Sequence, residues 1–238
     1  MTDVALQEIS MMIPEGNILK LPTNFQLTQY AKVKKLLLKA GGVYKRNTFV
    51  FKSDAAAIQN SFCAGEDMNK VKKFQYFPTP PQLVKKALEK ADVQPHHSWL
   101  EPSAGQGHIA DELMKISTNG CLVELMDDNV DVLREKHYDV QHIDFLEFNG
   151  GLYDRIVANP PFTNNQDIKH IQKMYEHLAN DGVLVSYSSL SWKIGSQRIQ
   201  NDFKNWLEAV GAEIELIEAG EFRSSGTEVS TVLITIRK

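Results

Sequence analysis

The stretch His97-Ser98-Trp99-Leu100-Glu101-Pro102-Ser103-Ala104-Gly105-Gln106-Gly107 determines the architecture we expect for this chain. Its first five residues predict a short strand, and residues 108–114 predict the start of a helix. Glycine at positions 105 and 107 permits a tight turn between the two and lets the backbone approach a ligand closely. Glu101 ends the strand with a carboxylate that suits a cationic amine. A strand, a glycine loop and a helix in this order are typical of nucleotide-binding α/β folds.

This loop fits more than one class of nucleotide. Gly105-x-Gly107-x-x-Ala110 also matches the fingerprint of nicotinamide-dinucleotide enzymes. A lone match of this kind is weak evidence. An acid at the end of the next strand does not discriminate either, because both families place one there. The choice therefore depends on a second motif.

That second motif is Asn159-Pro160-Pro161-Phe162, which follows the apolar run 154–158, an expected buried strand. Each proline lacks an N–H, so the strand stops and Asn159 lies at its carboxyl end, where open α/β sheets bind ligands. The Asn159 amide oxygen and the Pro160 carbonyl can accept hydrogen bonds from one amino group, and Phe162 offers a stacking surface. This set suits a planar base with an exocyclic amino group, and a dehydrogenase would not require it.

The remaining pattern from residue 80 onward alternates between expected strands and helices. The expected helices are 80–88, 108–114, 129–136, 167–178 and 197–210, and the expected strands are 97–101, 120–125, 140–143, 154–158, 182–187, 213–218 and 230–237. Alternation with short connections predicts a parallel sheet that is covered on both faces, and the last two strands are expected to form an antiparallel end pair.

The first 75 residues differ from the rest in charge. They hold 11 Lys+Arg and 6 Asp+Glu, a net charge of +5, whereas residues 76–238 hold 15 and 24, a net charge of −9. We expect residues 1–75 to form a separate small α+β domain and residues 76–238 to form the main domain. The basic excess indicates contact with a polyanion, and a structural appendage with a solvated basic face remains the open alternative.

The expected elements of this small domain follow from its sequence pattern. They are a strand at 16–21, a helix at 25–40 capped by Thr23 or Asn24, a hairpin over 43–51 with its turn at 45–47, a helix from Asp54 to about Phe62, and a polar linker at 65–73.

Three motifs in order carry a resemblance to a known family. Phe77-Pro78-Thr79-Pro80, the Glu101–Gly107 loop and Asn159-Pro160-Pro161-Phe162 resemble the motifs of S-adenosylmethionine-dependent amino-methyltransferases. More narrowly, they resemble DNA adenine-N6 methyltransferases of restriction systems, phages and mobile elements, over roughly residues 75–238. The resemblance implies a Rossmann-like class I methyltransferase fold with a mostly parallel seven-stranded sheet and a C-terminal antiparallel hairpin. It also implies S-adenosylmethionine as cofactor and methyl transfer to the exocyclic amino group of adenine in DNA.

The same resemblance implies roles for individual residues. Asn159, Pro160, Pro161 and Phe162 are the expected catalytic residues. Glu124 would bind the ribose hydroxyls, with Leu125 or Met126 beside the adenine ring, and Asp144 and Phe145 would hold the adenine amino group and ring face. The expected cofactor contacts are completed by Phe77, Thr79, Pro80, Glu101, Pro102, Ser103, Ala104, Gly105 and Gly107, and by Asn159 at the pocket edge. Taken singly, Asp144 could be a helix cap and Glu124 an ordinary surface carboxylate.

Composition places further bounds on the chain. No apolar run approaches the ~20 residues of a membrane span. Cys63 and Cys121 match no metal-binding spacing, so we expect reduced core cysteines in a cytoplasmic protein and no metal. No large target-recognition domain is evident, which leaves residues 1–75 and the stretch 188–198, with Trp192, Lys193 and Arg198, as candidates for nucleic-acid contact. Weak sequence selectivity, a dimer and a partner subunit that supplies specificity all remain open.

Three alternative functions also remain open. Adenine methylation in structured RNA uses the same four-residue motif. Methylation of a protein glutamine uses a similar motif, usually with tyrosine at the position of Phe162. A non-catalytic nucleic-acid-binding subunit could retain the cofactor fold, although intact residues at both sites argue against it.

Overall fold

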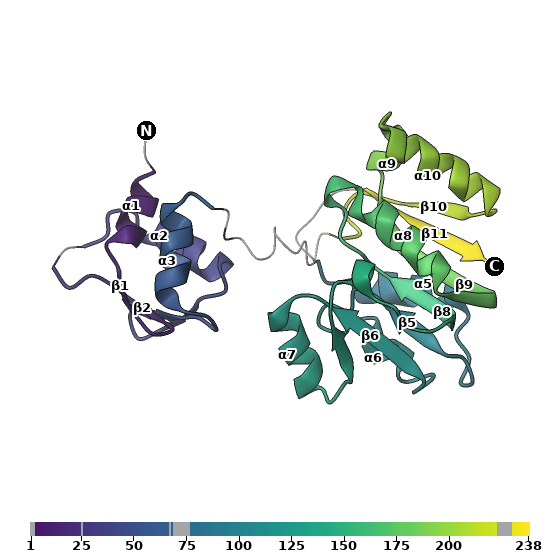
Figure 1. Ribbon diagram of the computed structural model, residues 1–238, viewed down its shortest axis with the longest axis horizontal. Coiled ribbons are helices and arrows are strands. Elements are labelled where there is room, and N and C mark those ends of the chain that lie inside the picture. Colours follow the sequence, from purple (N-terminus) through teal and green to yellow (C-terminus); the bar gives the residue numbers. More distant parts are fainter. Residues whose placement is uncertain (1–2, 25, 67, 69–76, 223–229) are drawn as a thin grey trace. The chain divides into compact units, whose positions relative to one another are not determined.

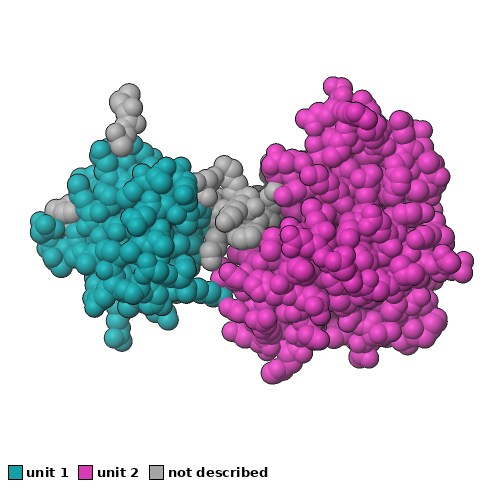
Figure 2. All heavy atoms as spheres, in the orientation of Figure 1, with its two compact units in different colours: residues 1–75 teal, residues 76–238 magenta. Residues whose placement is uncertain are grey.

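The computed structural model describes residues 3–24, 26–66, 68, 77–222 and 230–238. It divides the chain into two compact units, residues 1–75 and 76–238, called here the small unit and the large unit (Figure 2). Most of the linker expected at 65–73 and the expected first helical residue, Phe25, lie outside the described residues. None of the helices in the described ranges is long and apolar enough to cross a membrane.

The small unit repeats a helix followed by a β-hairpin and closes with a third helix (Figure 1). Its elements are α1 (Val4–Ser10), β1 (Ile13–Glu15), β2 (Ile18–Lys20), α2 (Tyr30–Lys39), β3 (Val43–Lys45), β4 (Thr48–Val50) and α3 (Ala55–Cys63). The four strands form one antiparallel sheet in the order β1-β2-β4-β3. The hairpin at 43–51 is confirmed, and its turn residues Arg46 and Asn47 have φ values of 46° and 64°.

The start of helix α2 differs from the prediction. It begins at Tyr30, and neither Thr23 nor Asn24 caps it. The buried Glu8 of helix α1 does so instead, because its carboxylate accepts hydrogen bonds from the backbone N–H groups of Thr28 and Gln29. The Gln29 N–H, at the N-cap position, is one of the donors that a helix start leaves without an intrahelical partner. The prediction that Cys63 lies in the core is also wrong, because this side chain is exposed at the end of α3.

The large unit contains a seven-stranded sheet in the order β10-β11-β9-β8-β5-β6-β7. Its strands are β5 (Trp99–Glu101), β6 (Gly120–Glu124), β7 (Val140–His142), β8 (Tyr153–Ala158), β9 (Leu178–Ser189), β10 (Glu213–Ile217) and β11 (Thr231–Arg237). Strand β11 pairs antiparallel with both β9 and β10, and the ladder from β9 to β7 is parallel. The predicted mostly parallel sheet with an antiparallel C-terminal pair is therefore confirmed.

Helices cover both faces of this sheet. They are α5 (Pro81–Ala91), α6 (Ala110–Leu113), α7 (Asp127–Glu135), α8 (Gln166–Glu176), α9 (Ser191–Ile194) and α10 (Arg198–Ala209), with short 3₁₀ turns η1 (Phe145–Glu147) and η2 (Thr163–Asn165). One core cluster packs α5, α6 and α7 against the sheet, and a second cluster packs α8 and α10. The layers are those that a buried parallel sheet requires.

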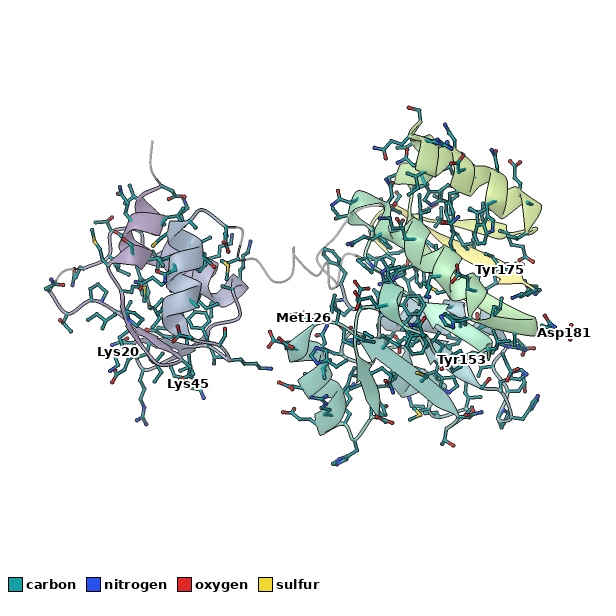
Figure 3. The ribbon with its side chains drawn as sticks, viewed as in Figure 1. Lys20, Lys45, Met126, Tyr153, Tyr175 and Asp181 are labelled. Carbon is teal, nitrogen blue, oxygen red and sulfur yellow. The ribbon has the colours of Figure 1, made fainter. Side chains whose placement is uncertain are left out.

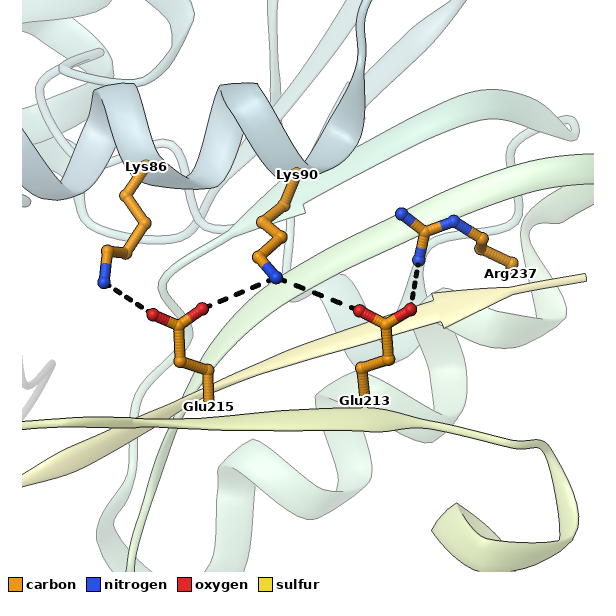
Figure 4. Close-up of polar contacts among 5 residues, drawn as sticks. All are labelled: Lys86, Lys90, Glu213, Glu215 and Arg237. Atoms are coloured by element: carbon orange, nitrogen blue, oxygen red, sulfur yellow. Dashed lines mark hydrogen bonds and ion pairs between the residues drawn. The ribbon is translucent and has the colours of Figure 1, made fainter.

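Ion pairs connect helix α5 to the end of the sheet (Figure 4). Lys86 lies 2.7 Å from Glu215, Lys90 bridges Glu215 and Glu213 at 3.5 and 3.9 Å, and Arg237 lies 3.1 Å from Glu213. Lys86 holds the pKa of Glu215 below its usual value. These side chains are partly exposed, so each pair contributes at most about 1 kcal/mol. The charges also protect the edge strand β10 from pairing with another chain.

Candidate active site

Four neighbouring parallel strands of the large unit end at one edge of the sheet (Figure 1). In the spatial order β8, β5, β6 and β7, their ends carry Asn159, Glu101, Glu124 and, after a short turn, Asp144. Starting from β5, the chain adds β6 and then β7 on one side of the sheet. It then returns to the other side of β5, where it adds β8 and then β9. The order therefore reverses between β5 and β8, which is where open α/β sheets bind their ligands.

The glycine loop that follows β5 is packed closely between strand and helix. Gly105 and Gly107 have φ values of +54° and +85°. A Cβ atom at position 107 would lie 2.9 Å from Leu133 Cδ2. The backbone N–H of Ala104 donates to the Val123 carbonyl at 3.0 Å, which fixes the start of the loop. Only glycine fits this path without strain.

Glu101 is a buried acid with an unsatisfied oxygen. Its side chain is 2% exposed, and Oε2 has no hydrogen-bond partner. Burial raises the pKa of this carboxyl well above its usual value, the Ala110 N–H opposes that shift, and the charge of Glu124 adds to it. An orphaned buried carboxylate oxygen is costly to the fold. A cationic amine in the site would satisfy it.

Glu124 connects the glycine loop to the end of β6. Its Oε2 accepts from the Gly105 N–H at 2.6 Å, and its Oε1 accepts from the Leu125 and Met126 N–H groups at 2.9 and 2.7 Å. Burial raises the pKa of Glu124, although these hydrogen bonds oppose the shift. Glu124 is therefore a buried, hydrogen-bonded acid and not an ordinary surface carboxylate. The neighbouring Leu125 side chain is 47% exposed and Met126 is buried.

The residues after β7 divide between the surface and the core. Asp144 caps the turn η1, with Oδ1 accepting from the Leu146 N–H at 2.9 Å. Phe145 is only 2% exposed, and its ring packs with Phe148 and with the rings of His170 and His177. The structure thus differs from the expectation that Phe145 offers a ring face, because that ring belongs to the hydrophobic core.

The Asn159 side chain is held by the segment that precedes helix α5. Its Nδ2 donates to the Phe77 carbonyl and to Thr79 Oγ1, both at 3.2 Å. Because both amide hydrogens are donated within the protein, the side-chain oxygen is the atom left to accept from a ligand. Thr79 and Pro80 are buried, and Phe77 is half-buried. The first and third motifs, more than 75 residues apart in the sequence, therefore meet at this edge.

The remaining residues of this motif are partly covered. Pro160 is buried, Pro161 is half-buried, and Phe162 packs against the core cluster that contains α5. Asn164 and Asn165 follow with φ values of 57° and 58°, a left-handed conformation that is uncommon outside glycine. Pro102 of the glycine loop is buried, and Ser103 is half-buried.

Two contacts that the sequence did not predict hold this strained turn. Asn165 donates to Gln197 Oε1 at 2.8 Å and accepts from Gln200 Nε2 at 3.0 Å. Asp167 is fully buried, and its Oδ2 accepts from the hydroxyls of Ser188 and Ser189 at 2.8 Å each. An acid in the first turn of a helix is an ordinary pattern, so the sequence carried no signal of these long-range pairs.

Trp192 is not the surface contact that the sequence indicated. It is 2% exposed, its Nε1 donates to Ser188 Oγ at 3.0 Å, and its ring packs edge-on against Phe203. Lys193 and Arg198 of the same stretch are exposed, as predicted for a contact surface. In the described parts of the chain, no group of three or more His, Cys, Asp or Glu side chains is arranged to hold a metal ion.

Comparisons with curated proteins find methyltransferases. No family model matches the chain. It is 26% identical to a modification methylase, CviBIII, of Paramecium bursaria Chlorella virus NC1A, over 65% of this chain and 48% of that protein. It is 27% identical to an rRNA adenine N-6-methyltransferase of Bacteroides fragilis, over 54% of this chain and 51% of that protein. The chain thus spans about half the length of the curated relatives it matches.

Comparisons with solved structures find the same fold. A modification subunit of a putative type I restriction enzyme from Vibrio vulnificus YJ016 superposes with a TM-score of 0.56 at 17% identity, over 77% of this chain and 49% of that one. A dimethyladenosine transferase from Plasmodium falciparum gives a TM-score of 0.54 at 13% identity, over 68% and 63%. The orphaned Glu101 oxygen and the glycine loop fit an amine-bearing nucleoside. The chain therefore has the Rossmann-like methyltransferase fold and resembles the adenine methyltransferases of restriction-system and viral type, with S-adenosylmethionine as the methyl donor of that fold.

Proposed function

We propose that the large unit transfers a methyl group from S-adenosylmethionine to the exocyclic amino group of adenine in DNA. The observation that carries this proposal is the Asn159 amide, whose nitrogen donates to Phe77 and Thr79 and whose oxygen is left to accept. The viral modification methylase, which matches the larger share of this chain, supports DNA as the substrate.

The residues act mainly by positioning. The adenine amino lone pair is delocalised into the ring, so the nitrogen is a poor nucleophile until it becomes tetrahedral. If its two hydrogens are accepted by Asn159 Oδ1 and the Pro160 carbonyl, the lone pair is directed away from the ring and the charge that develops on nitrogen is stabilised. S-adenosylmethionine supplies the electrophilic methyl group on a cationic sulfur. Phe162 stacks on the base.

The cofactor-binding roles belong to the same proposal. Glu101 binds the cationic amine, which would satisfy its unpaired Oε2. Glu124 binds the ribose hydroxyls with the lone pairs that its backbone contacts leave over, and the exposed Leu125 flanks the adenine ring. Asp144 accepts from the cofactor's adenine amino group through the oxygen that does not cap η1. Gly105 and Gly107 would contact the methionine part, and so would Thr79 and Pro80.

The small unit supplies contacts to the nucleic-acid backbone. Residues 16–53 contain eight Lys or Arg and no Asp or Glu. Lys20 and Lys32 form ion pairs with Glu15 and Asp3. Lys35, Lys39, Lys45 and Arg46 are exposed, and within the described ranges no ion pair involves them. Basic clusters of this kind bind phosphates.

RNA is the second candidate substrate, favoured by the match to an rRNA adenine N-6-methyltransferase. A dimer or a partner subunit that supplies sequence recognition also belongs to the proposal, since helix α8 begins four residues after Phe162 and leaves no inserted domain there.

The direct test is transfer of radiolabelled methyl groups by the full chain to unmethylated duplex DNA, single-stranded DNA and rRNA. We expect transfer to DNA, and we expect Asn159→Ala to abolish it while the affinity for S-adenosylmethionine changes little. Asn149→Ala, at an exposed asparagine whose amide donates to the Glu147 carbonyl, is the matched control. Full activity of Asn159→Ala would contradict the mechanism, and transfer to rRNA alone would select the second candidate.

A further inference from the structure

One apolar side chain of the large unit is almost fully exposed. Ile194 is 84% exposed, compared with 62% for Leu152 and 56% for Leu216, the next most exposed large apolar residues in the described chain. Isolated exposed apolar residues are ordinary. Ile194 differs from them in two respects. The segment that carries it is held by buried contacts, and that segment is connected to the turn after the Asn159 motif.

The segment that carries Ile194 is held by buried contacts and hydrogen bonds. Trp192, two residues earlier, is buried between Ser188 and Phe203. The Ile194 N–H donates to the Leu190 carbonyl, and the Gly195 carbonyl accepts from Lys204 Nζ at 2.8 Å. A Cβ atom at position 195 would lie 2.0 Å from Gln200 Oε1, so the chain turns there with no spare room. We call residues 190–197 the projection, and Ile194 is its exposed apolar residue.

The projection leaves the same sheet edge as the Asn159 motif. Strands β8 and β9 run parallel with Ala158 opposite Ser186, so both continue beyond this edge side by side. Two contacts then connect the segments that follow them. Asp167 binds Ser188 and Ser189 at the base of the projection. Asn165 binds Gln197 at its far end. The projection is therefore fixed to the turn that carries Phe162.

Two cations flank the apolar side chain. Lys193 precedes Ile194 directly and is exposed. The Arg198 side chain is 96% exposed and forms an ion pair with Asp202 at 3.6 Å. The large unit has a net charge of −9, so two exposed cations beside this apolar side chain differ from its prevailing negative charge. An apolar tip between cations fits the stacked bases and the flanking phosphates of a nucleic-acid duplex.

We propose that Ile194 enters the base stack of duplex nucleic acid and fills the space that the target adenine leaves when it turns out toward Asn159, while Lys193 and Arg198 contact the adjacent phosphates. This inference rests on the proposed function and specifies its substrate as base-paired. A base inside a duplex must leave the stack before its amino group can react, at a cost in free energy. Apolar side chains insert between base steps in minor-groove DNA-binding proteins. One that fills the vacated space would restore apolar contact to the neighbouring bases.

The test compares methyl transfer to the same DNA in its double-stranded and single-stranded states. Because both states have the same sequence, the recognition sequence of the enzyme does not have to be known. Unmethylated bacteriophage DNA is offered native or heat-denatured to the full chain, and initial rates of methyl transfer are measured. We expect Ile194→Ala to lower the rate on native DNA roughly 10-fold or more and to leave the rate on denatured DNA within about 2-fold of wild type. Ile194→Leu, which keeps an apolar side chain, should restore most of the native rate.

Matched variants separate insertion from a general surface effect. Leu152→Ala removes an exposed apolar side chain directly before β8, at the opposite edge of the sheet, and should leave both rates unchanged. Equal rates for Ile194→Ala and wild type on native DNA would overturn the inference and leave the proposed function intact. So would a wild-type enzyme that methylates only denatured DNA. Transfer to no nucleic acid in any state would overturn the proposed function itself.

Discussion

The small and large units of this protein carry opposite charge, and the difference matches two kinds of ligand. The small unit has a net charge of +5, and the large unit has a net charge of −9. The acids that end strands β5 and β6 suit a cofactor with a cationic amine and sulfonium, but the same field repels phosphates. A basic unit on the same chain can bind the polyanion without neutralising the acids that the cofactor site needs.

The cations of the small unit lie on two connected surfaces. Lys35 and Lys39 are one turn apart on α2, beside the exposed Leu38. Lys45 and Lys20 flank Thr48 across three strands of the sheet, and Figure 3 shows both on its outer side. Lys34 lies over the Tyr44 ring at 4.1 Å and connects the helix to the hairpin. The contrast between units is therefore built into folded surfaces, which makes it testable by substitution.

The largest effect should follow from reversing the small unit's charge. Changing Lys35, Lys39, Lys45 and Arg46 together to glutamate should weaken DNA binding by up to about three orders of magnitude at 0.1 M salt. Each lost phosphate contact removes roughly 0.9 from the slope of log affinity against log salt. Fluorescence anisotropy of a labelled duplex at several salt concentrations measures both quantities. S-adenosylmethionine affinity should not change.

The control for this variant has the same charge change in the other unit. Lys85, Lys115, Lys169 and Lys173 lie on helices or turns of the large unit, and their reversal should alter the salt slope much less. If both variants bind DNA alike, net charge alone explains the binding and the small unit is a structural appendage.

The sequence predicted the large unit better than the small one. The strand ends that carry Glu101, Glu124 and Asn159 were predicted because parallel strands place their carboxyl ends at a common edge. The hydrogen bond from Asn159 to Thr79 was not predicted, because it joins segments 80 residues apart and no local pattern indicates it. The first helix and hairpin of the small unit were largely missed, because strands as short as Ile13–Glu15 give too few residues for a period to be recognised.

Side chains whose roles depend on tertiary contacts were the least predictable. Phe145 and Trp192 were expected at functional surfaces, and both are buried. An aromatic residue after a strand can face a ligand or the core, and only the packing of helices α8 and α10 decides between them. Glu8 as the cap of α2 is a contact across 20 residues, so no capping pattern near Tyr30 indicated it.

A second experiment measures how a buried acid of the large unit contributes to cofactor binding. Glu124→Ala should weaken S-adenosylmethionine binding by about 1.5–3 kcal/mol, the typical value of a lost charged hydrogen bond. Because the side chain is 9% exposed, this loss should vary little with salt, in contrast to DNA binding. Titration calorimetry at low and high salt measures it. Wild-type affinity would remove Glu124 from the ribose role, and a strong salt dependence would mean that its charge acts at long range.

The smallest effect should be a gain in stability. Glu101→Gln removes a buried acid with an unpaired oxygen, and it should weaken cofactor binding while stabilising the large unit without cofactor. The folded-state pKa of Glu101 is raised above the value of 4.5 that applies when the chain is unfolded. Above about pH 4.5 the unfolded chain therefore releases this proton more readily than the folded one, so wild-type stability falls as pH rises toward the folded-state pKa.

The variant lacks this titration, so its advantage should be near zero at pH 5 and grow toward pH 8. A difference of ~1 kcal/mol corresponds to roughly 2–4 °C in Tm for a unit of this size.

Thermal unfolding followed by tryptophan fluorescence measures this difference. It reports the large unit alone, because that unit contains the chain's three tryptophans, Trp99, Trp192 and Trp206. Glu124, Asp111 and Lys136 also act on Glu101 and are present in both proteins, so the difference between the two curves isolates position 101. A constant difference from pH 5 to pH 8 would mean that Glu101 is already ionised in the folded protein. Burial of its charge would then carry no free-energy cost for a cationic ligand to relieve.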